Sequence, residues 1–196
     1  MAYASLSELR AFLRLASGET TDDTLLTNLL TYAQAFIESP QCCNRVFEAS
    51  ADTTRYFDAV EDTDGARLNF DTDCAAITAV TNGGAVVVPS TAYVTLPANQ
   101  TPYIGIQLLA SKGYTWQFVD DPENAISIAG KWAYSTTAPS AIKDATLVLG
   151  KWMYRQLNSD SDTDRPIISP DGTMLMPTAL PRMFWDLVNG YRRRSL

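Results

Sequence analysis

The sequence contains no histidine, so it lacks the side chain that most often serves as a general base or as a transition-metal ligand. Its three cysteines, Cys42, Cys43 and Cys74, are an odd number without CxxC spacing, which supports neither a disulfide framework nor a zinc site. We expect them to be reduced, structural thiols. The sequence also offers no glycine-rich phosphate loop, paired acid and base or activated nucleophile. It therefore predicts a protein that is not an enzyme and that needs no cofactor or metal.

Long apolar runs and positive charge are also scarce. Runs such as residues 85–89 are far shorter than the roughly 20 residues of a membrane span. The N-terminus lacks the apolar segment behind a basic start that marks a secretory signal. Lysine and arginine total 15 against 22 acidic residues, a net charge of −7. This balance argues against a sequence-independent nucleic-acid binder, which would need clustered cations.

Both ends of the chain have helical periodicity. The first predicted helix covers residues 5–16, where Ser5 and Glu8 have the spacing of a capping box, and it ends at Ser17-Gly18. A second helix begins after Asp22 or Asp23 and stops at Ser39-Pro40. Each has one apolar face, which must find a partner elsewhere in the fold.

The middle of the chain has the alternation of strands. Residues 54–60 and 66–70 flank an acidic turn, as in a hairpin, and Asn82-Gly83-Gly84 joins a second pair at 76–80 and 85–88. Further strands are predicted at 93–96, 104–109 and 114–119. About seven short strands at this spacing favour a small antiparallel sandwich or barrel.

Residues 125–157 join the two patterns, because a strand ending in aromatic residues is followed by a long apolar-striped helix. Ser135 to Thr137 supply candidate capping oxygens, and Pro139 suits the first helical turn. Three aromatic residues are assigned to the core at this strand-to-helix junction: Trp132, Tyr134 and Trp152. For Trp132 and Trp152, core packing is favoured over a stacking platform for sugars or bases.

An acidic loop follows this helix. Asp160, Asp162 and Asp164 resemble the start of a calcium loop, but Arg165 and Asp171 occupy positions that such a loop reserves for glycine and glutamate. A solvated loop is therefore favoured, and no metal site is expected.

The C-terminal segment is predicted to form a last amphipathic helix that begins at Pro181. Its apolar residues, Met183, Phe184, Trp185 and Val188, could pack within the chain or dock in a groove on another chain. The run Arg192-Arg193-Arg194 could complement the helix dipole or contact an acidic or phosphate-bearing partner.

These patterns together predict an α+β fold. Residues 1–47 and 135–196 would form a helical bundle core, and residues 48–134 would form an antiparallel β sandwich or barrel inserted between them.

Three segments in order give the chain a family resemblance: SLSELRAFLRL followed by TTDDTLLTNLLTYAQAFIE, then ISIAGKWAYSTTAPSAIKDATLVLGKWMYRQ, then LPRMFWDLVNGYRR. In these segments the sequence resembles the head-to-tail adaptor proteins of long-tailed bacteriophages, also called connector or head-completion proteins. The resemblance covers both ends of the chain. The β-rich middle matches less clearly and corresponds to an insertion.

The resemblance implies a structural protein of the virion neck, assembled in the host cytoplasm and not bound to a membrane. Such adaptors form a ring, commonly twelvefold, that joins the portal protein of the DNA-filled head to a stopper or tail-terminator protein, with DNA passing through the lumen. The terminal helix often contacts the portal, which gives seven portal-binding candidates here: Phe184, Trp185, Val188, Tyr191, Arg192, Arg193 and Arg194. An acidic surface suits a channel along which DNA slides.

Two other interpretations remain open. One is another phage structural protein, such as a tail terminator or a decoration protein, with the β part making the main subunit contacts. The other is a carbohydrate-binding or lytic β module, for which Asp58 and Asp71 would be the carboxylates to replace.

Overall fold

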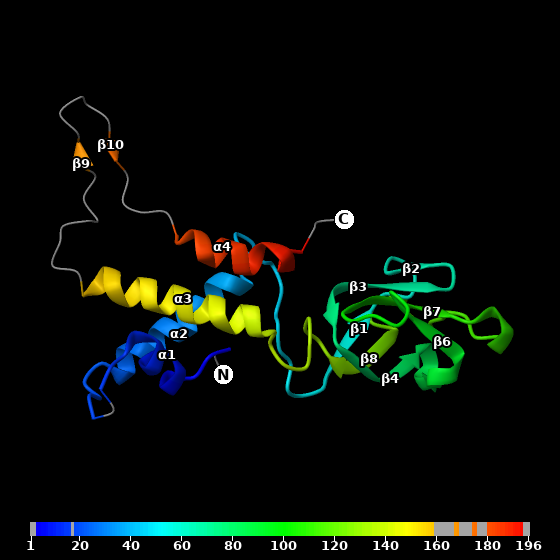
Figure 1. Cartoon of the computed structure of the whole chain (residues 1–196). Helices are drawn as coiled ribbons and strands as arrows, with labels where there is room; N and C mark the ends of the chain where they lie inside the picture. The colour runs from blue at the N-terminus through cyan, green and yellow to red at the C-terminus, as the bar shows by residue number, and fades with distance from the viewer. Residues whose placement is uncertain (1–2, 17, 159–166, 169–173, 176–179, 194–196) are drawn as a thin grey trace. The chain divides into compact units, whose positions relative to one another are not determined.

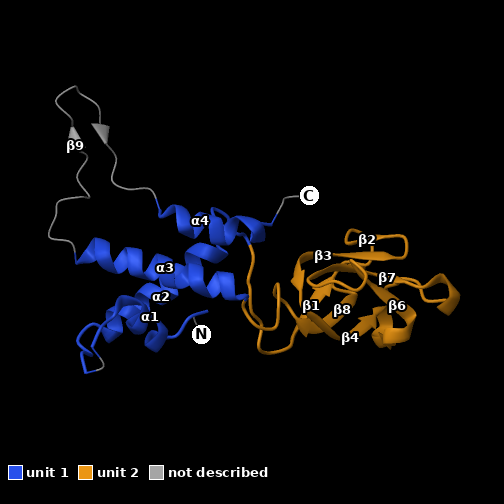
Figure 2. Cartoon of the chain, in the orientation of Figure 1, with its two compact units in different colours: residues 1–44, 139–196 blue, residues 45–138 orange. Residues whose placement is uncertain are grey.

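The computed structural model describes residues 3–16, 18–158, 167–168, 174–175 and 180–193. The chain divides into two compact units, coloured separately in Figure 2. We call residues 1–44 with 139–196 the helical unit, and residues 45–138 the β unit. The fold is α+β, as predicted, and the order of its elements can be followed in Figure 1.

Four α-helices make up most of the described helical unit: α1 (Leu6–Leu13), α2 (Asp23–Glu38), α3 (Ser140–Leu157) and α4 (Arg182–Val188). A 3-10 turn, η4 (Asn189–Tyr191), extends α4, and two short strands, β9 (Ile167–Ile168) and β10 (Met174–Leu175), pair with each other in antiparallel orientation. The helix α3 contacts each of the other three α-helices. Its residues 145–150 are buried on all sides, as expected of a helix that is surrounded by others.

The start of α1 has the predicted capping box. The Ser5 hydroxyl accepts a hydrogen bond from the Glu8 amide at 3.3 Å, and the Glu8 carboxylate accepts one from the Ser5 amide at 2.8 Å. The helix ends earlier than the predicted Ser17-Gly18, because Arg14 adopts a left-handed conformation with φ of 63°. There the Arg14 amide donates to Ala11 O at 3.1 Å and closes the last turn.

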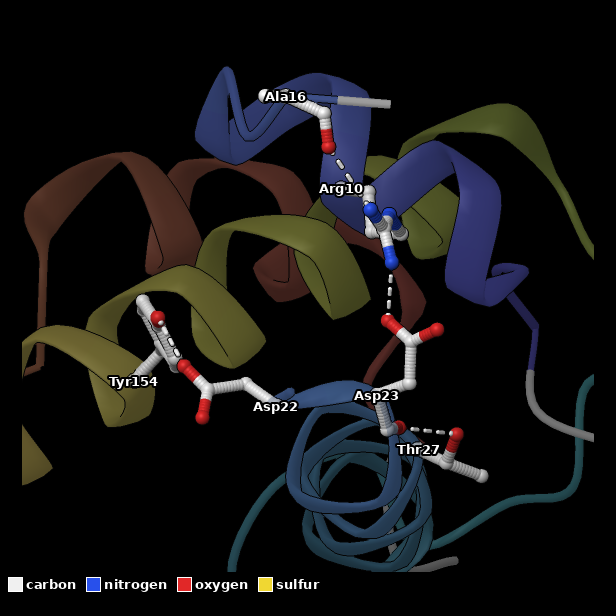
Figure 3. Close-up of polar contacts among 6 residues, drawn as sticks. All are labelled: Arg10, Ala16, Asp22, Asp23, Thr27 and Tyr154. Atoms are coloured by element: carbon white, nitrogen blue, oxygen red, sulfur yellow. Dashed lines mark hydrogen bonds and ion pairs between the residues drawn. The ribbon is translucent and has the colours of Figure 1, made fainter. Parts of the chain in front are cut away.

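The acidic pair at the start of α2 connects this helix to its neighbours instead of capping it (Figure 3). Asp22 occupies the N-cap position, but its carboxylate accepts a hydrogen bond from the Tyr154 hydroxyl of α3 at 2.6 Å. That bond to an anion raises the pKa of Tyr154. Asp23 forms an ion pair with Arg10 of α1, whose guanidinium also donates to Ala16 O at 2.9 Å. One end of α2 is thereby linked to both α1 and α3.

The predicted side-chain cap of α3 is wrong. Pro139 is the N-cap residue and no side chain caps the helix, while the Ser135 hydroxyl accepts from the Thr137 amide at 3.4 Å within the preceding turn. The Pro139 carbonyl itself accepts from Ile142 N at 2.9 Å. Ile142 is the third residue of the helix, so its amide, which a capping hydroxyl could have served, is bonded to the Pro139 carbonyl instead.

The β unit contains two antiparallel sheets of four strands. The first has the order β1 (Thr53–Phe57), β8 (Ile126–Lys131), β4 (Ala76–Asn82) and β5 (Val86–Val87). The second has the order β2 (Thr63–Asp64), β3 (Arg67–Cys74), β7 (Tyr103–Leu108) and β6 (Tyr93–Leu96). Buried residues of both sheets form one cluster, so the unit is a sandwich with a single core.

Three aromatic rings join the two sheets at the centre of that core. Phe57 of β1 lies 5.5 Å from Phe70 of β3, and Trp132, just after β8, lies 5.7 Å and 5.1 Å from these two rings. The indole N–H of Trp132 donates to Thr53 O at 3.0 Å, which satisfies the polar atom of this buried ring.

The hairpin predicted from residues 54–60 and 66–70 is wrong, because these two segments belong to different sheets. The strand β1 pairs with β8, and β3 pairs with β2 and β7. The chain turns at Asp58, whose carboxylate accepts from the amides of Val60 at 2.6 Å and Glu61 at 2.8 Å. This side-chain turn ends β1 before it can pair with β3. The hairpin predicted around Asn82-Gly83-Gly84 is confirmed as β4 and β5.

The strand predicted at residues 114–119 is also wrong. This segment joins neither sheet, and the side chain of Asn82 holds it in place. Asn82 donates to Thr115 O at 2.6 Å and accepts from Gln117 N at 3.1 Å and Gly83 N at 3.0 Å. A Cβ atom at Gly83 would lie 2.1 Å from Gln117 O, so only glycine permits this close approach.

The contribution of Glu8 to the stability of the helical unit depends on pH. Its ion pair with Lys143 and its bonds from Ser5 lower the pKa of Glu8 from 4.5 to about 2. The stabilisation is therefore complete above about pH 4.5 and is lost as the pH falls towards 2. We expect Glu8→Gln to lower the free energy of unfolding by no more than about 1 kcal/mol at neutral pH, because the pair is exposed, and to have a smaller effect near pH 2. Urea unfolding at both pH values measures this, and an effect that does not shrink on acidification would contradict it; Glu19→Gln is the matched control.

We expect the position of residues 114–119 to depend on the side chain of Asn82. It is 2% exposed and makes three hydrogen bonds, so Asn82→Ala leaves two amides and a carbonyl without their partner. We expect a loss of about 2–4 kcal/mol in unfolding free energy. Replacing the exposed Asn69 with alanine should change it by less than about 0.5 kcal/mol. Equal effects of the two substitutions in thermal or urea unfolding would show that Asn82 does not have this role.

Candidate interaction surface of the helical unit

The short helix α4 owes its position to packing, since seven residues form too short a helix to be stable alone. Pro181 is its N-cap residue, and the Pro181 carbonyl accepts from the Phe184 amide at 2.9 Å. Phe184 and Val188 are both fully buried, and they lie one turn apart on the same face of the helix. The Phe184 ring is 6.0 Å from Phe36 of α2 and 5.1 Å from Trp185.

This burial corrects the set of portal-binding candidates. Phe184 and Val188 were among the portal-binding candidates, but both belong to the core of the helical unit and expose no surface to a partner. The reason is that α4 packs against α3, and its Phe184 ring lies against Phe36 of α2. The side chains that α4 exposes are Arg182, Met183 and Asp186. Trp185 is half-buried.

Hydrogen bonds from the basic residues after α4 join the C-terminal segment to the turn that follows α2. Arg192 donates from Nε to Cys42 O at 2.8 Å and from Nη2 to Gln41 O at 3.2 Å, and its guanidinium lies 6.0 Å from the Trp185 ring. The Arg193 amide donates to Cys43 O at 2.9 Å. Arg192 therefore has a structural role, whatever else it contacts. Tyr191 and the Arg193 side chain are half-buried, and Arg194 lies outside the described residues.

The three cysteines are buried and form no disulfide, as expected of structural thiols. The Cys43 thiol donates to Val188 O at 3.8 Å, and its sulfur is 3.8 Å from that of Cys42. That sulfur contact lowers the pKa of Cys42, whereas burial raises the pKa of Cys74 to about 11. The contact between Cys43 and Val188 adds one more link between α4 and the end of α2.

An open groove of about 230 Å³ lies where α1, α3 and α4 meet. Phe12 and Met183 are 37% and 56% exposed, and they provide apolar walls together with half-buried Trp152. Lys151 lies with its ammonium 4.7 Å from the Phe12 ring, and Arg155 is exposed on the next turn of α3. The complete lining is Phe12, Val148, Lys151, Trp152, Arg155, Pro181 and Met183. A groove with apolar walls and two cations suits an apolar side chain that has carboxylates beside it.

The three aromatic residues expected at the strand-to-helix junction lie in different surroundings. Trp132 is in the sandwich core, which leaves no face free for stacking on a ligand. Tyr134 packs against Phe47 at 5.7 Å, with the Arg45 guanidinium 5.1 Å from its ring. Trp152 belongs to the helical unit and lines the groove. Sequence reasoning missed this groove because its walls come from three segments that are far apart in the chain.

The search for metal and membrane sites applies only to the described residues. Among them, no three His, Cys, Asp or Glu side chains gather as metal ligands would. The carboxylates of the possible calcium loop, Asp160, Asp162, Asp164 and Asp171, lie outside the described residues. No helix in the described part of the chain is long and apolar enough to cross a membrane.

No protein-family model and no curated protein sequence matches this chain. Solved structures with a similar fold include the neck of an empty gene transfer agent particle determined with sixfold symmetry, at a TM-score of 0.60 and 17% identity over 99% of this chain and 91% of the other. The neck of the native particle, determined with twelvefold symmetry, matches at 0.55 and 17% identity over 97% and 89%. A chain of the native virion matches at 0.55 and 19% identity over 99% and 91%. Along nearly its whole length, this chain therefore has a fold that occurs in the neck of gene transfer agent particles.

Proposed function

We propose that this chain is a head-tail adaptor, a structural protein whose copies form a ring between the portal vertex of a DNA-filled head and the tail. One observation carries the proposal: the whole fold, with both its helical and its β unit, matches a chain of a particle neck over 99% of this sequence. The neck structures were determined with sixfold and twelvefold symmetry, which supports a ring of twelve copies. On this proposal, the protein is assembled in the host cytoplasm and is part of the finished virion.

The distribution of charge supports a passage for DNA. The β unit has 5 basic and 11 acidic residues, a net charge of −6, and the helical unit has 10 and 11, a net charge of −1. An acidic protein surface repels the phosphates of DNA, so it allows the molecule to pass through a lumen without binding it. DNA is accordingly proposed as cargo and not as a ligand.

The surface proposed to meet the portal is the C-terminal segment beyond the buried face of α4. Trp185, Tyr191, Arg192, Arg193 and Arg194 remain from the original seven candidates. Hydrogen bonds to the turn that follows α2 hold Arg192 and Arg193 in place, so the exposed atoms of these two residues are presented to a partner at low entropic cost. The opposite face of the ring would receive a stopper or tail-terminator protein.

Binding to the portal protein encoded with this chain tests the proposal directly. The wild-type chain should co-sediment with purified portal rings, and Arg193→Glu with Arg194→Glu should weaken that binding at least about tenfold while leaving the fold intact. Arg193 contributes its backbone amide to the fold, which the substitution keeps. A control reversal at two exposed cations elsewhere in the chain, Arg14→Glu with Lys112→Glu, should bind as the wild type does.

Two results would count against this assignment. If the wild-type chain does not co-sediment with portal, the adaptor proposal fails. If both double reversals bind portal as the wild type does, the C-terminal segment is not the contact with portal. That contact then lies elsewhere on the chain.

A further inference from the structure

Two neighbouring segments of the β unit expose four large apolar side chains. They are Val86 and Val87 on β5 and Phe118 and Val119 in the segment held by Asn82, with exposed fractions of 39%, 66%, 45% and 72%. A Cβ atom at Gly84 would lie 3.1 Å from Val119, so the two segments are in contact. We call these four residues the β patch. An exposed apolar cluster of this kind typically marks a protein contact.

The β patch is held in place by the hydrogen bonds of Asn82 to Thr115 and Gln117. A rigid apolar surface loses little conformational entropy when it is covered, which favours its use as a docking surface. Carboxylates follow the β patch in the chain. Asp120 and Asp121 come directly after Val119, Glu123 is two residues further on, and all three are exposed.

The groove of the helical unit has the complementary properties. It offers apolar walls at Phe12 and Met183, and its cations are Lys151 and Arg155. The β patch has apolar side chains with carboxylates beside them, and the groove has an apolar interior with cations beside it. Pairing two patches would bring like charges together, and so would pairing two grooves. Only patch against groove brings opposite charges together.

We propose that the β patch of one copy of this chain docks in the helical-unit groove of a second copy. The proposal rests on the ring proposed above. A contact between two different surfaces is heterologous, and heterologous contacts generate closed rings when the rotation between copies closes. Val119, the most exposed member of the β patch, is the side chain that enters the groove, and Asp120 and Asp121 face Lys151 and Arg155 of the second copy.

Two single substitutions that disable opposite sides of the contact provide the test. Val119→Asp disables the β patch and Met183→Asp disables the groove; both residues are exposed, so neither change should unfold the chain. Sedimentation velocity over a concentration series should show assembly of the wild type and at least about tenfold weaker self-association of each variant. Mixed together, the two variants retain one intact patch and one intact groove, and they should form a one-to-one dimer that grows no further. Val60→Asp, at an exposed residue outside the β patch, is the control and should assemble as the wild type does.

Reversing the charges gives a second readout. Lys151→Glu with Arg155→Glu should weaken assembly, and adding Asp120→Lys with Asp121→Lys in the same chain should restore it. The contact is wrong if Val119→Asp and Met183→Asp assemble like the wild type, as they would if another segment of the chain or another protein filled the groove. It is also wrong if the mixture gives no dimer. Either result leaves the adaptor proposal standing, because that proposal is tested separately by binding of the wild type to portal.

Discussion

The burial of α3 is the constraint on which the helical unit depends. Residues 145–150 of this helix are enclosed on every side. They are shielded from water only when the three other helices pack around α3. Leu9 of α1 reaches to within 3.5 Å of where a Cβ atom of Gly150 would lie, and Leu147 packs with Leu26 and Leu30 of α2. These helices come from opposite ends of the sequence. The β unit can therefore be inserted between them without interrupting the helical core.

The same constraint explains why α4 is not a free docking helix. Its sequence is as apolar as that of a helix that docks on another protein, but the apolar face of α4 packs within its own chain, against Phe36 of α2. Phe184 and Val188 therefore stabilise the unit, and contacts with other proteins fall to the residues around them. Arg192 also contributes to the fold, because its guanidinium donates to the carbonyls of Gln41 and Cys42.

The sequence predicted local features well where one residue type determines the geometry. The capping box of Ser5 and Glu8 and the turn at Asn82-Gly83-Gly84 are examples, and so is the α+β fold. The sequence did not predict the features that tertiary contacts determine. Residues 54–60 have strand character, but which sheet they join depends on the turn at Asp58. Residues 114–119 alternate like a strand, yet the buried side chain of Asn82 satisfies their backbone in place of a neighbouring strand. The ion pair of Arg45 with the buried Asp73, at 3.2 Å, and the groove on α3 also join distant segments that no local pattern links.

Electron microscopy of the wild-type chain bound to the portal rings encoded with it tests the central claim most directly, because it reports attachment and symmetry together. Our account predicts an added layer on one face of the portal, with twelve copies around an open channel. Portal rings without an added layer, beside a chain that stays monomeric, would contradict it.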